Sequence, residues 1–274
     1  MNPEKAYKNL TFLNSPEARS IRILCEYEEP LQRFLKEQVS DTIVFFGSAR
    51  AKSEEDLNKE IQKTEKQLQE ASADQQESIQ AALLRLNNTK PLTEYYEKTR
   101  ELARRVTEWD LKRFGTQKYF VTTGGGPGIM EAANRGASEV EGGKSVGLGI
   151  SLPFEAGLNP YVTPELGFEF HYFFTRKYWF LYLCKAMVIC PGGFGTLDEL
   201  FEALTLRQTG KITKPIPTVL FGTEYWNSLF NLDVMVKWGT ISPQDVDLMF
   251  ITDSIDDAFD YLVEGILAAE REDS

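Results

Sequence analysis

The sequence predicts an α/β domain with an open, doubly wound (Rossmann-like) and mostly parallel sheet that carries helices on both faces. Short continuous apolar runs alternate with helical patterns along the chain, and such runs are typical of strands that are buried on both faces. This alternation indicates βαβ units with parallel strands. The predicted strands are residues 42–46, 119–122, 145–150, 168–173, 186–190, 218–221 and 248–251. The clearest predicted helices are residues 92–114, 128–140, 176–184, 197–206 and 254–269.

We expect one domain over residues 1–274 that is enlarged by three additions. At the front, Ser15 followed by Pro16 is typical of a helix start, and a second helical pattern follows over residues 30–39. This extension is expected to cover the domain or to lie against a partner subunit. The three additions are an N-terminal helical extension (1–40), a helical hairpin insertion (about 52–90) and a C-terminal extension (about 223–274).

The insertion at about 52–90 is rich in Glu, Lys, Gln and Ala and carries a narrow apolar stripe. Spacings of three, four and seven residues between its apolar positions predict helices. A stripe this thin needs a partner surface, and a solvated spacer is the alternative. The stripe consists of Leu57, Ile61, Leu68, Ile79, Leu83 and Leu86.

Composition excludes several classes of protein. Of the 274 residues, 42% are hydrophobic, which is enough for a sizeable core and excludes a wholly disordered chain. The formal net charge of −11 argues against a binder of nucleic acid polymers. It does not exclude a small anionic ligand, because a few backbone N–H groups and one Arg can outweigh the global charge locally.

Cysteine and histidine are scarce. The spacing of Cys25, Cys184 and Cys190 matches no zinc site, and His171 lacks a nucleophile turn that would support a catalytic triad. Cys184 and Cys190 lie in or beside apolar runs and are expected to be reduced core residues. We expect no metal and no cofactor. Neither a signal peptide nor a membrane span of about 20 apolar residues is present, so a cytoplasmic protein without membrane partners is expected.

Two glycine-rich loops follow predicted strands. Glycine lets the backbone turn tightly and approach a ligand, and the helix that follows offers free N–H groups to an anion. Because both loops lie at carboxyl ends of parallel strands, we expect a nucleotide in the crevice there. The first loop contains Gly124, Gly125 and Gly126, and the second contains Gly192, Gly193, Gly195 and Thr196.

Neither loop fits the better-known nucleotide motifs. A P-loop would close with Lys and Ser or Thr, and a dinucleotide fold needs a different glycine spacing with an acid at the end of the next strand. Glu199 lies one turn into the helix after the second loop. A carboxylate beside a phosphate site is unfavourable unless it binds ribose hydroxyls or stabilises positive charge on the sugar.

Residues 191–199 read Pro-Gly-Gly-Phe-Gly-Thr-Leu-Asp-Glu and fit P-G-G-x-G-T-x-x-E, the signature of the LOG family of nucleotide phosphoribohydrolases, long described as possible lysine decarboxylases. The glycine-rich turn at 124–133, the pair Arg176-Lys177 and the pair Gly47-Ser48 after the first strand also resemble that family. The resemblance extends over about residues 41–222, and the chain resembles the longer members. A pyridoxal decarboxylase would need a Schiff-base lysine, which neither loop supplies.

The resemblance implies hydrolysis of the N-glycosidic bond of a nucleoside 5′-monophosphate, AMP-like or cytokinin-nucleotide-like, to free base and ribose 5-phosphate. It assigns catalysis to Arg176 and Glu199. The implied phosphate- and ribose-binding residues are Gly47, Ser48, Gly124, Gly125, Gly126, Lys177, Gly192, Gly193, Gly195 and Thr196. The resemblance also implies a homodimer or larger homo-oligomer. The alternative is a carrier of the same fold that binds a nucleotide or a molybdenum-type cofactor without cleaving it.

Overall fold

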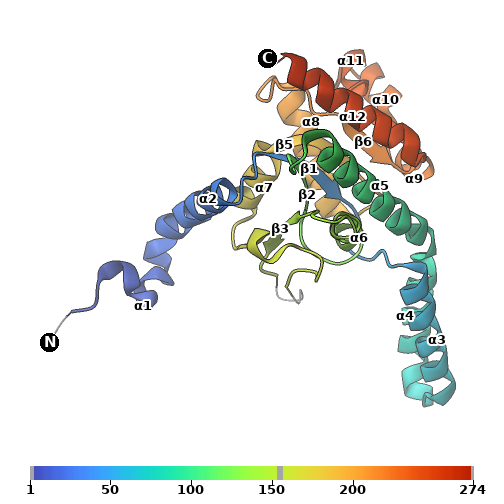
Figure 1. The fold of residues 1–274 in the computed structure, drawn as a ribbon. Coiled ribbons are helices and arrows are strands. Elements are labelled where there is room, and N and C mark those ends of the chain that lie inside the picture. Colours follow the sequence, from blue (N-terminus) through green and yellow to red (C-terminus); the bar gives the residue numbers. More distant parts are fainter. Residues whose placement is uncertain (1–2, 153–156, 273–274) are drawn as a thin grey trace.

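Seven parallel strands form one sheet in the computed structural model, which describes residues 3–152 and 157–272 (Figure 1). Their spatial order is β4-β3-β2-β1-β5-β6-β7, and every neighbouring pair runs parallel. The doubly wound α/β class predicted from the sequence is therefore confirmed. The strands are β1 (Asp41–Phe46), β2 (Tyr119–Thr123), β3 (Ser145–Ile150), β4 (Gly167–Phe170), β5 (Cys184–Ile189), β6 (Thr218–Phe221) and β7 (Phe250–Thr252).

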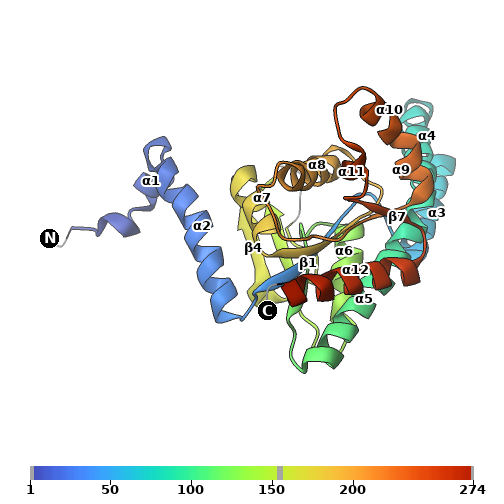
Figure 2. The same ribbon diagram turned by 90° about the horizontal axis from the view of Figure 1, so that it is seen from above.

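Helices cover both faces of the sheet (Figure 2). One face packs against α5, α6 and α12, and the other packs against α7 and α8. The terminal residues 1–2 and 273–274 of the expected single domain lie outside the described part of the chain. The helices are α1 (Leu10–Leu13), α2 (Arg19–Lys36), α3 (Glu54–Glu70), α4 (Ala73–Asn88), α5 (Lys90–Phe114), α6 (Ile129–Ser138), α7 (Phe173–Tyr182), α8 (Phe194–Gln208), α9 (Thr223–Leu229), α10 (Leu232–Lys237), α11 (Pro243–Val246) and α12 (Ile255–Glu272).

Strand β1 shows why the strand runs are continuously apolar. Its successive side chains point to opposite faces, so Ile43 and Phe45 join the core beneath α5, α6 and α12. Val44 and Phe46 join the core beneath α7 and α8. All four are buried, because each face of the sheet is covered.

The expected strand over residues 168–173 is shorter than predicted. Strand β4 ends at Phe170, and α7 already begins at Phe173 rather than at residue 176. The backbone N–H groups of His171 and Tyr172 donate to the Glu26 carboxylate of α2, at 2.7 and 3.2 Å, and so leave the sheet. The apolar pattern alone could not reveal this acceptor, because it lies on a distant element.

The two helical patterns predicted in the N-terminal extension form one long helix, α2, with Pro30 inside it. Proline lacks the N–H that would bond to the carbonyl four residues earlier, which here belongs to Glu26. That carbonyl instead accepts a hydrogen bond from the Trp179 indole of α7 at 3.0 Å. The helix therefore continues through Pro30, because α7 supplies the donor that proline removes.

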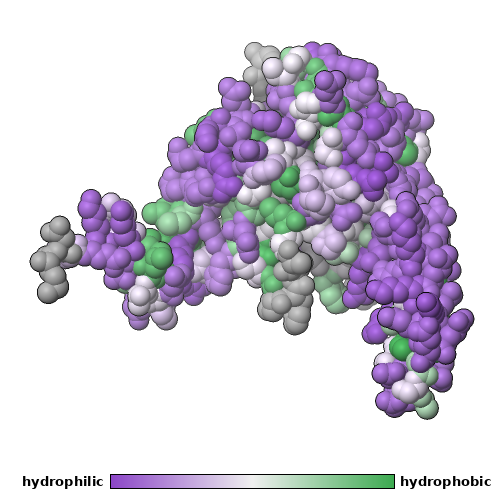
Figure 3. All heavy atoms as spheres, turned by 60° about the horizontal axis from the view of Figure 1, so that its bottom comes forward, coloured by the Kyte–Doolittle hydropathy of each residue, from purple (hydrophilic) through white to green (hydrophobic). Residues whose placement is uncertain are grey.

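The N-terminal arm, defined here as residues 3–24, extends away from the sheet (Figures 1 and 2). Apolar side chains lie on its surface, as Figure 3 shows. Leu10 is 68% exposed and Leu24 is 56% exposed. Among the described residues, no helix is long and apolar enough to cross a membrane.

The segment predicted as a helical hairpin forms α3 and α4, joined through Ala71 and Ser72, and projects beside α5 (Figure 1). Leu57 and Ile61 of its apolar stripe are buried, and the other four residues of the stripe are half-buried. Leu84, outside the stripe, is 62% exposed. Helices α3 and α4 pack on each other and on the start of α5. Much of the partner surface that the stripe requires is therefore provided within the same chain.

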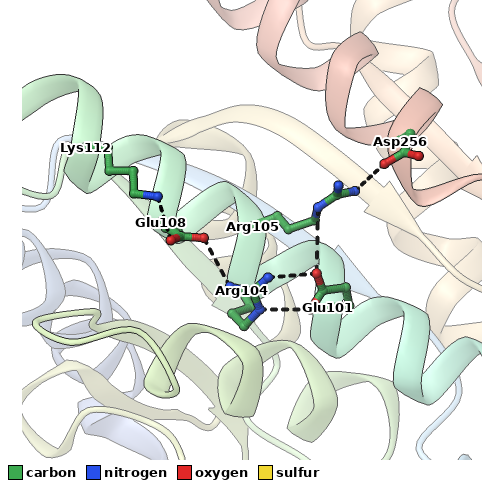
Figure 4. A network of polar contacts seen from close by, with 6 residues as sticks. All are labelled: Glu101, Arg104, Arg105, Glu108, Lys112 and Asp256. Carbon is green, nitrogen blue, oxygen red and sulfur yellow. Dashed lines mark hydrogen bonds and ion pairs between the residues drawn. The ribbon is translucent and has the colours of Figure 1, made fainter.

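Polar contacts tie α5 to the C-terminal helix (Figure 4). Arg105 of α5 pairs with Asp256 of α12 at 2.6 Å and with Glu101 at 3.7 Å. On the same helix, Arg104 lies between Glu101 and Glu108 at 2.8 and 3.1 Å. Of these pairs, Arg105–Asp256 joins the two helices, and the others lie along the surface of α5.

The strand order changes direction between β1 and β5, and a crevice opens at the carboxyl ends of such strands. Three backbone hydrogen bonds connect the loops there. Cys190 donates to Phe46 at 2.8 Å, and Ser48 donates to Pro191 at 2.9 Å. Ser48 in turn accepts from Ile129, the first residue of α6, at 3.1 Å. The fold thus brings the ends of β1 and β5 and the start of α6 together.

Candidate active site

A cavity of about 570 Å³, called here the catalytic cavity, lies at this edge of the sheet. Its volume falls in the range of small-molecule sites. Loops after β1, β2 and β5 and side chains from α7 and α8 form its walls. Residues predicted from the sequence that line it are Gly47, Ser48, Gly124, Arg176, Gly193, Gly195, Thr196 and Glu199.

Four predicted residues do not line this cavity. Gly125 and Gly126 are buried in the loop behind it, and the Gly192 carbonyl accepts a hydrogen bond from Tyr225 at 2.6 Å. Lys177 pairs with Glu202 at 2.5 Å and with Asp198 at 3.0 Å. The Lys177 ammonium is therefore held on α8 rather than in the cavity.

Glu199 is the most unusual ionisable group of the cavity. It lies on α8 and only 5% of it is exposed. Burial raises the pKa of this carboxyl to about 7, although the cations of Lys177 and Arg176 act to lower it. Its Oε2 has no hydrogen-bond partner among the described residues. A carboxyl that titrates near neutral pH in a cavity is typical of a catalytic acid or base.

Arg176 lies on α7 and lines the same cavity as Glu199. Its Nε donates to the Leu148 carbonyl at 2.6 Å, and its guanidinium lies 5.1 Å from the centre of the Phe180 ring. A Cβ built on Gly124 would collide with this guanidinium. Glycine at 124 therefore provides the space that Arg176 occupies.

The start of α8 offers an anion site. A Cβ built on Gly193 or Gly195 would meet no atom within 4 Å, so packing does not explain these glycines. The first N–H groups of an α-helix lack intrahelical acceptors and carry the positive end of the helix dipole. Because Gly193 and Gly195 have no side chains, these N–H groups remain accessible to a phosphate. At Gly192, by contrast, a Cβ would strike Thr196, so that glycine serves packing.

A buried network, which the sequence analysis missed, holds the first glycine loop. The Asn159 amide donates to the carbonyls of Gly125 and Gly126 at 3.1 and 3.0 Å and to Asn134 at 2.9 Å. Thr123 also donates to Asn134, at 2.6 Å. A polar residue on the apolar face of the predicted helix 128–140 was an available signal for Asn134. No local pattern pointed to Asn159.

Glu26 is a second residue that the sequence did not single out. Besides the two backbone N–H groups before α7, its carboxylate accepts a hydrogen bond from Thr175 at 2.6 Å. It therefore connects α2 to the start of α7, the helix that carries Arg176. The N-terminal extension thus contributes to the framework of the cavity.

The aromatic residues around Arg176 differ in burial. Trp179 and Phe180 are buried, as expected of core residues. Phe173 and Phe174, by contrast, are each 53% exposed at the start of α7. Phe173 lines the catalytic cavity. Its ring is in place to stack on a planar base.

The described residues contain no group of three or more His, Cys, Asp or Glu side chains that could hold a metal ion. Cys184 and Cys190 are free and buried, in agreement with their expected place in the core. The ionisable side chains that line the cavity are the carboxyls of Asp198 and Glu199 and the guanidinium groups of Arg50 and Arg176. The hydroxyls of Ser48 and Thr196 and the N–H groups at the start of α8 complete its polar lining.

Parts of the chain are similar to known proteins, and a family model matches the part that contains Arg176 and Glu199. The model of a family described as possible lysine decarboxylase matches residues 130–262. Cytokinin riboside 5′-monophosphate phosphoribohydrolase LOG1 of Arabidopsis thaliana is 45% identical over 60 residues, which are 21% of this chain and 27% of the relative. The cytokinin riboside 5′-monophosphate phosphoribohydrolase of Mycobacterium tuberculosis is 35% identical over 78 residues, 27% of this chain and 39% of the relative.

A third relative, the probable cytokinin riboside 5′-monophosphate phosphoribohydrolase LOGL3 of Oryza sativa, is 34% identical over 87 residues, 31% of this chain and 41% of the relative. The chain thus spans between 27% and 41% of the length of these relatives. The family model, these relatives and the seven-stranded parallel sheet agree. The match of residues 130–262 and the partial matches to these relatives support the resemblance of this chain to the LOG family.

Proposed function

We propose that this protein hydrolyses the N-glycosidic bond of a nucleoside 5′-monophosphate, with an AMP-like or cytokinin-like base, to a free base and ribose 5-phosphate. The observation that carries the proposal is the buried Glu199 carboxyl, which has a pKa of about 7 and shares a cavity with Arg176 and an open helix N-terminus. Relatives that match 21% and 27% of the chain are named as cytokinin riboside 5′-monophosphate phosphoribohydrolases.

The phosphate binds at the start of α8 in this proposal. Gly193, Gly195 and Thr196 line the cavity where the first N–H groups of the helix are accessible, and Ser48 lines the same cavity. The base extends toward Phe173, which stacks on it. This pose places the ribose between Arg176 and Glu199.

Bond cleavage leaves positive charge on the ribose, since the bonding electrons depart with the base. The ionised Glu199 carboxylate stabilises this oxocarbenium-like charge, as carboxylates do in glycoside hydrolysis. Water then adds to the sugar and releases a proton. Because the pKa of Glu199 is about 7, its carboxylate can accept that proton near neutral pH. The leaving base takes its proton from solvent.

Arg176 has an electrostatic role. A guanidinium remains protonated at any working pH and cannot act as a general acid or base. Its charge lowers the pKa of Glu199 against the effect of burial and so increases the ionised fraction. Its donors also hold the phosphate or ribose in the proposed pose.

The test is to incubate the purified protein with a panel of nucleoside monophosphates and to measure free base by chromatography. We expect release from at least one nucleotide, and a loss of at least about a hundredfold in Glu199→Gln and Arg176→Gln. Glu224→Gln is the matched control, since Glu224 is exposed on α9 away from the cavity. Nucleotide binding without release from any substrate would support the carrier alternative instead.

A further inference from the structure

The α3–α4 hairpin encloses a second cavity of about 720 Å³ beside the first, called here the hairpin cavity. The loop Ser48-Ala49-Arg50 lines both cavities, and Gly192 lies on the floor of the second. The two cavities therefore flank one loop at the carboxyl ends of β1 and β5. A volume of this size accommodates a small molecule.

Positive charge is in excess in the hairpin cavity. Its lining contains Arg50, Lys52 and Arg85 against one acid, Glu60. Glu60 pairs with Lys52 at 2.6 Å, so these two charges neutralise each other. Among the described residues, the guanidinium groups of Arg50 and Arg85 form no ion pair. Two unneutralised arginines in a protein with a net charge of −11 create a local site for an anion.

The two arginines come from different parts of the chain. Arg50 belongs to the loop after β1, whereas Arg85 lies on α4 at the base of the hairpin. Guanidinium groups bind phosphate oxygens through pairs of parallel hydrogen bonds. A phosphate between them would connect the hairpin to the loop that also borders the catalytic cavity.

We propose that the hairpin cavity binds a second phosphate group next to the nucleotide, with Arg50 and Arg85 as its ligands. The position of this group beside the 5′-phosphate rests on the proposed function. The phosphate belongs either to the distal end of a nucleoside diphosphate that spans both cavities or to a separate pyrophosphate-like anion. Both sources present the same chemistry to the two arginines.

The test uses the full chain with Glu199→Gln, which prevents turnover, and isothermal titration calorimetry with pyrophosphate, ADP and AMP. In this background, Arg85→Ala is expected to weaken pyrophosphate or ADP binding by about tenfold or more, because hydrogen bonds to charged groups are strong. AMP affinity should stay the same. Arg85→Lys should restore part of the loss. Lys63→Ala is the control, since it removes one exposed positive charge of the same hairpin outside the cavity.

The two sources give different results. Pyrophosphate that still binds to the AMP-saturated chain indicates a separate anion, whereas ADP affinity that depends on Arg85 indicates a spanning nucleotide. Equal affinities of Arg85→Ala and Lys63→Ala for pyrophosphate and ADP, or no binding of either anion, would overturn the proposal. The base-release assay tests the proposed function independently. Arg85-dependent anion binding without base release from any nucleotide would refute the hydrolase function but would still support the anion site in the hairpin cavity.

Discussion

The Glu26 carboxylate of α2 accepts a hydrogen bond from the Thr175 hydroxyl of α7 at 2.6 Å, one residue before Arg176. The same carboxylate binds two backbone N–H groups ahead of the helix. A negative charge at a helix N-terminus is favourable. The N-terminal extension therefore fixes the helix that carries a proposed catalytic residue.

Replacement of Glu26 by Gln should lower kcat several-fold with a smaller effect on KM. The neutral amide is a weaker acceptor for the donors of α7, so Arg176 is held less firmly. We also expect a loss of about 1–3 kcal/mol of unfolding free energy. Steady-state kinetics and denaturant unfolding measure the two effects. Glu28→Gln is the control because Glu28 is exposed on the same helix. Identical kcat values for the two variants would contradict the positioning role.

Activity should rise with pH through about 7. Burial raises the pKa of Glu199 to about 7, and the proposed mechanism needs its ionised form. The ionised fraction, and with it kcat/KM for the free enzyme, therefore increases from pH 6 to 8 and then levels off. A pH profile of base release measures this. A pH profile that is flat over that range would contradict the requirement for an ionised Glu199 carboxylate.

The Glu199 carboxyl should also make the unfolding free energy fall as pH rises, whereas activity rises with pH. Its pKa is about 7 in the folded chain against an ordinary value of 4.5, so the folded state binds more protons between these values. The contribution is fully present below pH 4.5 and is lost as pH rises to 7. Relative to Glu199→Gln, the unliganded wild-type chain should lose up to about 3 kcal/mol across this window. Parallel urea titrations of both chains at pH 4.5 and 7.5 test this.

Two adjacent glycines should respond differently to alanine. Gly193→Ala places a methyl group in open space on the cavity wall, so the unfolding free energy should change little while KM for the nucleotide rises about tenfold. Gly192→Ala forces a methyl group onto Thr196 and should destabilise the chain by about 1–3 kcal/mol. Thermal unfolding and substrate titration of both variants separate the effects. An unchanged KM in Gly193→Ala would argue against phosphate binding at this position.

The contacts between α12 and the rest of the protein should contribute unequally to the unfolding free energy. Asp256 is 77% exposed where it meets Arg105, so Asp256→Ala should cost less than about 1 kcal/mol (Figure 4). Leu262 is fully buried in the core beneath the same helix, and Leu262→Ala should cost about 2–5 kcal/mol. Denaturant unfolding of both variants gives the comparison. A larger loss for Asp256→Ala would show that the surface pair, rather than the core, holds α12.

The sequence by itself determined the strands, most helices and the chemical character of the candidate site. These features depend on local periodicity and on short motifs, such as the apolar run of β1 and the loop that precedes Glu199. Strand ends and caps were less predictable. The end of β4 depends on a carboxylate from α2, which lies 145 residues away from His171.

Only the tertiary structure decided how the site is assembled. The pKa of Glu199 follows from its burial, and burial is a property of packed elements rather than of neighbours in the chain. The contacts of Asn159 with Gly125 and the cavity beneath the hairpin likewise join distant segments. A sequence pattern records which face of an element is apolar, but it does not record which other element that face will meet. The sequence therefore determined the elements and the residue types of the candidate site, and long-range packing determined the burial of these residues and the pKa of Glu199.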